Sequence, residues 1–218
     1  MGQVFVMSNY VLKYKRDERV KYISHLDFVR LFHRTVRRAG VSFLYSQGFN
    51  PHPIMTVAMP LSVGVTSDCE YLKAGFTDEL KINEIKSRIN NAFPPGFEVV
   101  EIKKLVGKEI DFSKITKAEY IVEIETEDDI DVKKFMALDE VKVMKKSKSG
   151  IKESDIRPFI YELEKVKTEN GIVTLKMCLA CGSGYNLKPD TVADAFCKYL
   201  DTKISFVSVH RNELIFEK

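Results

Sequence analysis

The stretch SHLDFVRLFHRTVRRAG, residues 24–40, contains the clearest single element of this 218-residue chain. Ser24, followed three positions later by Asp27, has the pattern of a capping box, which predicts that a helix begins here. Apolar residues recur behind it at helical spacing, and Ala39-Gly40 marks the end of the helix near Arg38. Strand-like sequence on both sides of this helix predicts a strand-helix-strand start to the fold.

Alternating apolar residues flank the predicted helix. Residues 10–16 precede it with a strand pattern, and Val41, Phe43 and Tyr45 follow it with the same period of two. The remaining elements of this half are expected as strands at 54–59, 69–76 and 97–102 and as a helix over 82–93. The first half therefore predicts the order strand, helix, strand pair, helix, strand, with the strand pair supplied by the stretches at 41–45, 54–59 and 69–76.

The second half predicts the same order. Strands are expected at 118–126, 141–146, 172–180, 204–209 and 213–216, with helices over 129–138 and 189–200. Asn170-Gly171 is typical of a hairpin turn, and residues 154–165 fit either a strand or a helical turn. The sequence therefore predicts an α+β protein of two tandem ferredoxin-like domains with antiparallel sheets, at 1–104 and 118–218, joined by a lysine-rich linker at 105–117.

The overall composition excludes several classes of protein. The chain has a net charge of +3, with 44% hydrophobic and 30% charged residues, as in an ordinary globular protein. No stretch has the length and hydropathy of a membrane span, and the first residues do not resemble a signal peptide. Four cysteines in a chain of this length are typical of a reducing compartment. The expected location is the cytoplasm, with no membrane partner.

The predicted first helix has a basic face. Its members are Arg30, His33, Arg34 and Arg37. Their spacing of three and four residues places them along one side of a helix. From Tyr10 to Arg38 the chain has nine Lys or Arg and three acids, so this end is markedly basic. Such a face is either simply solvated or lies against the phosphates of a nucleic acid.

The segment YSQGFNPHP, residues 45–53, follows the basic helix and its strand. Gly48 and the two prolines are turn formers, so the simplest interpretation is a rigid loop. Aromatic side chains in a loop also stack on unpaired bases, and amides hydrogen-bond base edges. A basic helix beside such a loop favours RNA binding. The loop residues expected to contact RNA are Tyr45, Gln47, Phe49, Asn50 and His52.

Several motifs in their order along the chain closely resemble a known family. They are Ser24-His25-Leu26-Asp27, the 45–53 loop, Ala58–Gly64 with the pattern A-x-P-L-x-V-G, and Glu70-Tyr71-Leu72. The family is the radical-SAM-linked, or radical-SAM-associated, domain of unknown function. In the second half, the resemblance is looser and consists of Asp155-Ile156-Arg157-Pro158 and Asn186-Leu187-Lys188-Pro189-Asp190.

The resemblance implies a partner rather than a reaction. Members of that family are fused to radical SAM enzymes or encoded beside them, often near genes of RNA or ribosome metabolism, and no activity is assigned to the domain itself. This chain has no C-x-x-x-C-x-x-C motif for a radical SAM cluster. It is therefore expected to be a non-catalytic accessory protein without a cofactor, which binds a radical SAM enzyme, RNA (tRNA or ribosomal RNA), or both.

Other chemistries remain as alternatives. His25 or His52 provides an acid–base group for a metal-independent endoribonuclease, although no second catalytic group can be assigned from sequence. A protein-interaction scaffold without an RNA role is the third alternative. Cys178 and Cys181 form a C-x-x-C pair, but neither Cys69 nor Cys197 is spaced as a further ligand, so no metal site is expected. No catalytic residue is assigned.

Overall fold

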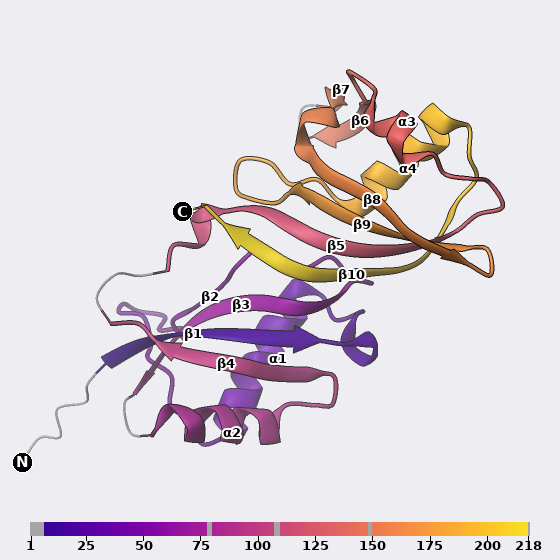
Figure 1. The fold of residues 1–218 in the computed structure, drawn as a ribbon. Coiled ribbons are helices and arrows are strands. Elements are labelled where there is room, and N and C mark those ends of the chain that lie inside the picture. Colours follow the sequence, from indigo (N-terminus) through magenta and orange to yellow (C-terminus); the bar gives the residue numbers. More distant parts are fainter. Residues whose placement is uncertain (1–6, 78–79, 107–109, 148–149, 218) are drawn as a thin grey trace, which may run out of the picture. The chain divides into compact units, whose positions relative to one another are not determined.

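The computed structural model describes residues 7–77, 80–106, 110–147 and 150–217. By their contacts, the chain divides into two compact units, residues 1–112 and 113–218, called here the first and the second unit. Each unit combines helices with an antiparallel sheet, so the protein is of the α+β class. Figure 1 labels the helices and strands within each unit.

The first unit has the predicted element order. Its elements are β1 (Met7–Arg16), α1 (His25–Arg38), β2 (Met55–Val57), β3 (Thr66–Thr77), α2 (Ile82–Ala92) and β4 (Phe97–Lys104), with a 3₁₀ turn, η1 (Glu18–Val20), before α1. The strands lie in the order β4-β1-β3-β2, and every neighbouring pair is antiparallel. The sheet thus places β1, the strand that leads to α1, at its centre.

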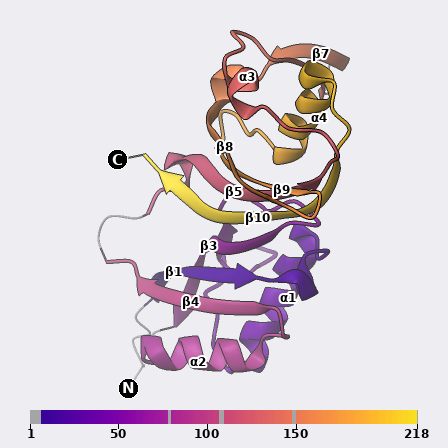
Figure 2. The same cartoon turned by 45° about the vertical axis from the view of Figure 1, so that its right-hand side comes forward.

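Helices α1 and α2 cover one face of this sheet (Figure 2). The side chains of β1 alternate, so that Tyr10, Leu12 and Tyr14 point to the same side and are buried. Phe28 and Phe32 of α1 pack onto that side, and the ring of Phe28 stacks on Tyr14 at 4.9 Å between centroids. The apolar face of α1 is thus used in the core, which leaves its other face to solvent.

Two strand predictions in the first unit need correction. Residues 41–45 form isolated bridges, Phe43 with Phe76 and Tyr45 with Pro53, instead of a continuous strand. The strand predicted at 54–59 is only Met55–Val57. Proline has no N–H to donate to a ladder, so Pro51 and Pro53, which both follow the loop tip, interrupt the pairing on the returning side of the loop.

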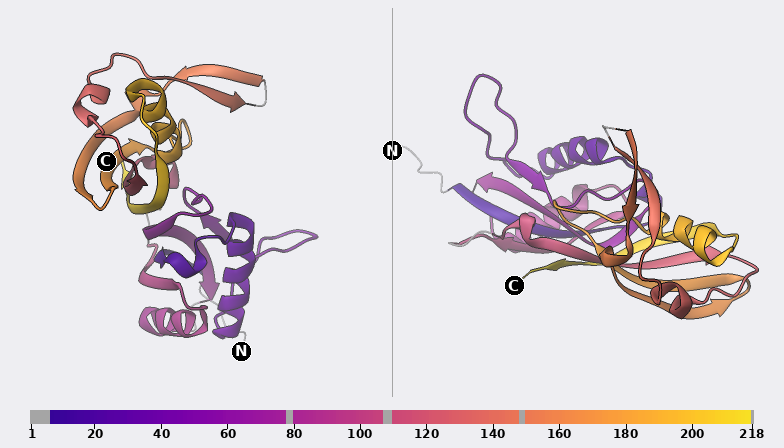
Figure 3. Two further views of the ribbon diagram at one scale, coloured as in Figure 1. Left: turned by 90° about the vertical axis from the view of Figure 1, so that its right-hand side faces the viewer. Right: turned by 90° about the horizontal axis from the view of Figure 1, so that it is seen from above.

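The second unit repeats the order with an addition. Its elements are β5 (Ile115–Glu125), α3 (Val132–Met136), β6 (Lys142–Ser147), β7 (Gly150–Asp155), β8 (Ile160–Glu169), β9 (Ile172–Ala180), α4 (Pro189–Leu200) and β10 (Ser205–Phe216), with 3₁₀ turns η2 (Phe112–Lys114, which begins in the first unit) and η3 (Arg157–Phe159). Its sheet has the order β10-β5-β9-β8, all antiparallel. Strands β6 and β7 pair with each other in a separate two-stranded ribbon, which projects from the helix side of the unit (Figure 3).

The ribbon corrects the prediction for the second half. The strand expected at 141–146 forms, but within the described residues it belongs to the ribbon and not to the main sheet. The ambiguous stretch 154–165 contains the start of β8, which pairs with β9. Strand β8 lies at a sheet edge, where polar residues are tolerated, so its apolar signal is weak: only Ile160 and Leu163 are buried.

Other expectations for the second unit are confirmed. Asn170 and Gly171 have φ angles of 52° and 78°, as a tight hairpin turn between β8 and β9 requires. Val173, Leu175, Met177 and Leu179 of β9 are all buried. Phe135 of α3 and Phe196 of α4 meet with ring centroids 4.6 Å apart, which completes the core. Among the described residues, no helix has the length and hydropathy needed to cross a membrane.

Candidate nucleic-acid interface

The start of α1 is held by a buried arginine. Nη2 of Arg16 donates to the carbonyl oxygens of Val20, Lys21 and Ile23 at 3.1, 3.3 and 2.9 Å. Ser24, the next residue, caps the helix: its Oγ accepts from the backbone N of Asp27 at 3.3 Å, as predicted. Sequence reasoning missed Arg16, because an arginine at the end of a strand is usually solvated. Its role here is to fix where α1 begins.

The arginines of α1 lie on the helix face opposite the core. Arg30, Arg34 and Arg37 are all exposed. Arg30 lies 3.3 Å from Asp27 in an ion pair across one helical turn. Within the described ranges, Arg34 and Arg37 form no ion pair. The outer face of α1 thus presents two guanidinium groups, three residues apart, that no carboxylate of the described residues neutralises.

His33 lies at the side of α1 and joins the helix to the following segment. Its ring meets Phe43 edge-on, with centroids 5.4 Å apart. Its Nε2 is buried and has no hydrogen-bond partner among the residues that the structure describes. Burial lowers the pKa of His33, because the charged imidazolium would lose its hydration. The structure therefore places His33 at the root of the loop, in the neutral form at neutral pH.

The stem of the 45–53 loop is anchored on β3. Leu44 N donates to Gly75 O at 2.8 Å, Gly75 N donates to Ile54 O at 3.0 Å, and Ile54 N donates to Leu44 O at 2.8 Å. A Cβ at Gly75 would lie within 3.0 Å of the Leu44 side chain, so this close approach favours glycine. Both sides of the stem are thus fixed to the sheet, and through Phe43 to α1.

Ser46 and His52 close the loop. Ser46 N donates to His52 O at 2.9 Å, and His52 N donates to Ser46 Oγ at 3.1 Å. The same Oγ lies 2.9 Å from Nδ1 of the His52 ring. Gly48, with φ of 123°, makes the turn at the tip. The Ser46–His52 bonds close the two sides of the loop on each other just below its tip.

The tip of the loop presents side chains to solvent. The exposed fraction of Phe49 is 111%, and that of Tyr45 is 49%. Gln47 and Asn50 are also exposed. Figure 3 shows the loop projecting from the first unit, with its stem beside α1. The structure therefore brings the predicted loop residues together in one projecting element, which His33 and Phe43 connect to the basic helix.

Two further arginines, one at the end of α1 and one on α2, line the same part of the surface. Nη2 of Arg38 donates to the carbonyl oxygen of Ala92 at 2.7 Å, and Arg88 of α2 lies 2.7 Å from Glu84. Both arginines line an open hollow with Phe93 and Pro94. Arg88 was not among the predicted residues, because it lies one turn after Glu84 in an ordinary ion-pair pattern.

The histidines considered for catalysis and the cysteines considered for metal binding lie in different surroundings. His25 is the first residue of α1, and His52 is exposed in the loop. Cys178 and Cys181 are both buried, and burial raises the pKa of the Cys178 thiol. No group of three or more His, Cys, Asp or Glu side chains in the described part of the chain has the arrangement of a metal site.

Comparison with known proteins gives a family and a fold. A family model described as "Uncharacterized protein conserved in bacteria (DUF2344)" matches residues 9–189. No curated protein has a sequence that matches this chain. A structure titled "Crystal Structure of a Cbf5-Nop10-Gar1 Complex" is similar with a TM-score of 0.54 at 8% identity, and covers 94% of this chain and 48% of that one.

A second solved structure has a similar fold. It is titled "Structure of H/ACA RNP bound to a substrate RNA containing 2'-deoxyuridine", with a TM-score of 0.51, 9% identity, and coverage of 94% of this chain and 47% of that one. This chain thus spans about half the length of both matched chains. At such identities the likeness is one of fold alone.

Proposed function

We propose that this chain, which belongs to the DUF2344 family of uncharacterized bacterial proteins, is a non-catalytic accessory protein that binds tRNA or ribosomal RNA for a radical SAM enzyme. In this proposal, each unit is a ferredoxin-like domain, and the first unit carries the RNA-binding surface. The surface consists of the outer face of α1 and the 45–53 loop.

The observation that carries the proposal is the exposure of Phe49. A fully exposed phenylalanine at the tip of a loop gains nothing from burial in the folded chain. The ends of the loop are braced by the Ser46–His52 hydrogen bonds and the contacts with Gly75, so Phe49 is presented from a closed loop that projects from the sheet. Exposed aromatic rings are what proteins use to stack unpaired bases of RNA.

The arginines of α1 supply the electrostatic part. Arg34 and Arg37 are exposed and form no ion pair within the described ranges, so binding of a phosphate breaks no existing contact. Arg30 is already ion-paired with Asp27, so it is expected to contribute less to phosphate binding. Gln47 and Asn50 beside Phe49 supply amide groups for base edges. His33, neutral and packed on Phe43, positions the loop rather than neutralising a phosphate.

The similar solved structures support this proposal through their fold. One of them is an H/ACA RNP bound to a substrate RNA. Because the identity is 9%, the side chains that bind RNA there are not carried over to this chain. The radical SAM partner is proposed from the resemblance of the 22–72 segment to the radical-SAM-linked family, and its test is co-purification with a radical SAM enzyme.

A salt titration of RNA binding tests the proposal. Changing Arg34 and Arg37 together to alanine should reduce the affinity for a single-stranded RNA and lower the slope of log K against log salt by about 1.4, since each lost phosphate contact contributes about 0.7. The matched control is Arg19→Ala with Lys103→Ala, which removes the same charge from side chains already paired with Asp17 and Glu101.

The outcomes separate the alternatives. An equal slope in the Arg34/Arg37 variant and the wild type would contradict the RNA-binding surface. The RNA should also be recovered intact after incubation, because no catalytic role is assigned. Discrete cuts that disappear in His52→Ala would replace the proposal with the endoribonuclease alternative. The scaffold alternative predicts a different result. Neither the wild type nor Phe49→Ala would bind RNA, and Phe49→Ala would lose a radical SAM enzyme that the wild type retains.

A further inference from the structure

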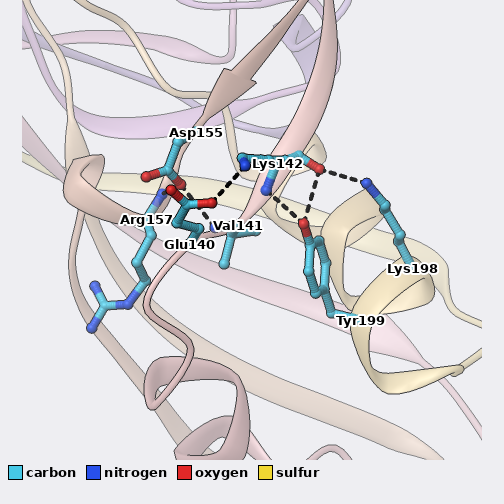
Figure 4. A network of polar contacts seen from close by, with 7 residues as sticks. All are labelled: Glu140, Val141, Lys142, Asp155, Arg157, Lys198 and Tyr199. Carbon is cyan, nitrogen blue, oxygen red and sulfur yellow. Dashed lines mark hydrogen bonds and ion pairs between the residues drawn. The ribbon is translucent and has the colours of Figure 1, made fainter.

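The β6–β7 ribbon of the second unit is anchored at its base by hydrogen bonds on both strands. Lys142 N donates to Tyr199 Oη at 2.6 Å, and the same hydroxyl donates back to Lys142 O at 3.2 Å (Figure 4). Lys198 Nζ also donates to Lys142 O, at 2.8 Å. On the other strand, Asp155 Oδ1 accepts from the backbone N of Val141 at 2.8 Å and of Arg157 at 3.0 Å.

Arg157 continues the anchor into the body of the unit. Its Nη2 and Nε donate to Met136 O at 2.8 and 3.2 Å, and its Nη1 donates to Ile160 O at 3.2 Å. The Asp155-Ile156-Arg157-Pro158 motif is thus structural: it fixes the exit of the ribbon. A two-stranded ribbon is only marginally stable in water, so this anchoring is what positions it.

The two faces of the ribbon carry different side chains. Lys145 lies directly opposite Lys152, on the face that also carries the buried Val143. Lys145 is tethered, with Nζ 3.9 Å from the ring centroid of Tyr185 and 2.6 Å from its hydroxyl. The other face carries Met144, which lies directly opposite Glu153, and Ile151; Met144 and Ile151 are each 66% exposed.

Protection of a sheet edge does not explain this composition. Residues 142–153 contain five lysines and one acid, and lysines are commonly used to prevent edge strands from pairing with other chains. Exposed Met144 and Ile151 work against that purpose, because exposed apolar side chains on a ribbon favour association with other chains. Lysines directly opposite each other also repel. Within the described ranges, Lys152 forms no ion pair, so this charge is left for a ligand.

We infer that the ribbon is a second RNA-binding element, which lies in the minor groove of an A-form RNA duplex. That groove is wide and shallow, and displays ribose hydroxyls and base edges between two phosphate backbones. Lys152 reaches a phosphate at the edge of the groove, and Met144 and Ile151 lie against the ribose surface. Lys145 holds the ribbon on Tyr185. The inference extends the proposed function to structured RNA, with unpaired bases bound by the first unit and a duplex stem bound by the second.

Fluorescence anisotropy with three labelled probes tests the inference on the full chain. The probes are a blunt RNA duplex, a single-stranded RNA and a DNA duplex. Lys152→Glu should weaken binding of the RNA duplex by on the order of tenfold at low salt, since a phosphate contact is lost. Met144→Ser with Ile151→Ser should weaken it several-fold. Both should bind the single strand as the wild type does. Lys167→Glu, on an edge strand and paired with Glu169, is the charge-matched control.

The results also separate this inference from the proposed function. Arg34→Ala with Arg37→Ala should affect the single strand and leave the duplex unchanged, which is the reverse pattern. Unchanged duplex binding in both ribbon variants would overturn the ribbon's role, whatever the arginine variant does. Equal losses on RNA and DNA duplexes would also overturn it, because a B-form minor groove is narrow. Lys152→Gln replaces Lys152→Glu if circular dichroism shows that the charge reversal disturbs the fold.

Discussion

The two units carry their additions at the same topological place, between the first helix and the second strand of the sheet. In the first unit this connection is residues 39–54 with the 45–53 loop; in the second it is residues 137–159 with the β6–β7 ribbon. Both project from a sheet of the same strand order. The comparison shows that one position in the fold tolerates insertions of quite different chemistry.

The two additions differ in how they are held and in what they present. The loop is braced by aromatic packing through Phe43, and its tip carries Phe49 and amides. The ribbon is held by hydrogen bonds from Tyr199, Asp155 and Arg157. Its exposed side chains are lysine and aliphatic. A loop held by aromatic packing is suited to stacking on single bases, and a two-stranded ribbon is suited to lying in the groove of an RNA duplex.

The largest expected effect concerns the root of the loop. Phe43 is buried and touches Phe32, His33 and Phe76. Phe43→Ala should lower the free energy of unfolding by about 3–5 kcal/mol, because it removes a core aromatic ring and leaves a cavity. Urea unfolding measures it, and Phe49→Ala, with its ring in solvent, is the control. Similar losses in both variants would mean that the loop tip is itself packed.

The tip should show the opposite behaviour. Phe49→Ala should leave stability unchanged and weaken single-stranded RNA binding by about 1–3 kcal/mol, the usual range for one stacked base. Anisotropy measures the affinity, with Tyr161→Ala as the control, because Tyr161 is also exposed but lies on β8 of the second unit. Full affinity in Phe49→Ala would show that Phe49 does not stack on an RNA base, and would contradict the proposed function.

The base of the ribbon should respond less than the root of the loop. Tyr199→Phe removes the hydroxyl that both accepts from and donates to the backbone of Lys142. The loss should be about 1 kcal/mol in the free energy of unfolding, since these bonds are partly replaced by water. Binding of the RNA duplex should also weaken, and a variant with full stability and full duplex affinity would show that the ribbon needs no such anchor.

The smallest effect is a pH dependence from His33. Its pKa in the folded protein lies below the ordinary value of 6.5, so the unfolded chain binds the proton more readily. The contribution to stability is present above that value and is lost as the pH falls below it. Urea midpoints between about pH 7.5 and about pH 5.5 should fall slightly more in the wild type than in His33→Phe. Equal falls would assign the pH dependence to other groups.

The first unit was largely predictable because its signals are local. Ser24 and Asp27 mark the start of α1, which begins at His25, and α1 ends at Arg38 as expected. The exposure of Arg34 and Arg37 follows from helical periodicity alone. His33 shares that periodicity, yet it lies against Phe43, because its place at the side of the helix depends on the segment that packs there.

The second unit was less predictable for two physical reasons. An alternating pattern such as Val141–Lys145 predicts a strand, but it says nothing of which strand becomes its partner. Strand β8 has few buried residues because one of its edges is unpaired within the described sheet, so its sequence is nearly that of a loop. The ribbon was therefore visible only once the pairing was known.

The amino-acid sequence by itself determined the helix start, the turns and the basic character of α1, because caps, glycines and periodic spacing act between residues close together in the chain. Only the tertiary structure decided that Arg16 holds the segment before α1 and that His33 packs on Phe43. It also decided that β6 and β7 pair with each other outside the main sheet. Each of these depends on contacts between distant residues, which form only when the whole unit is packed.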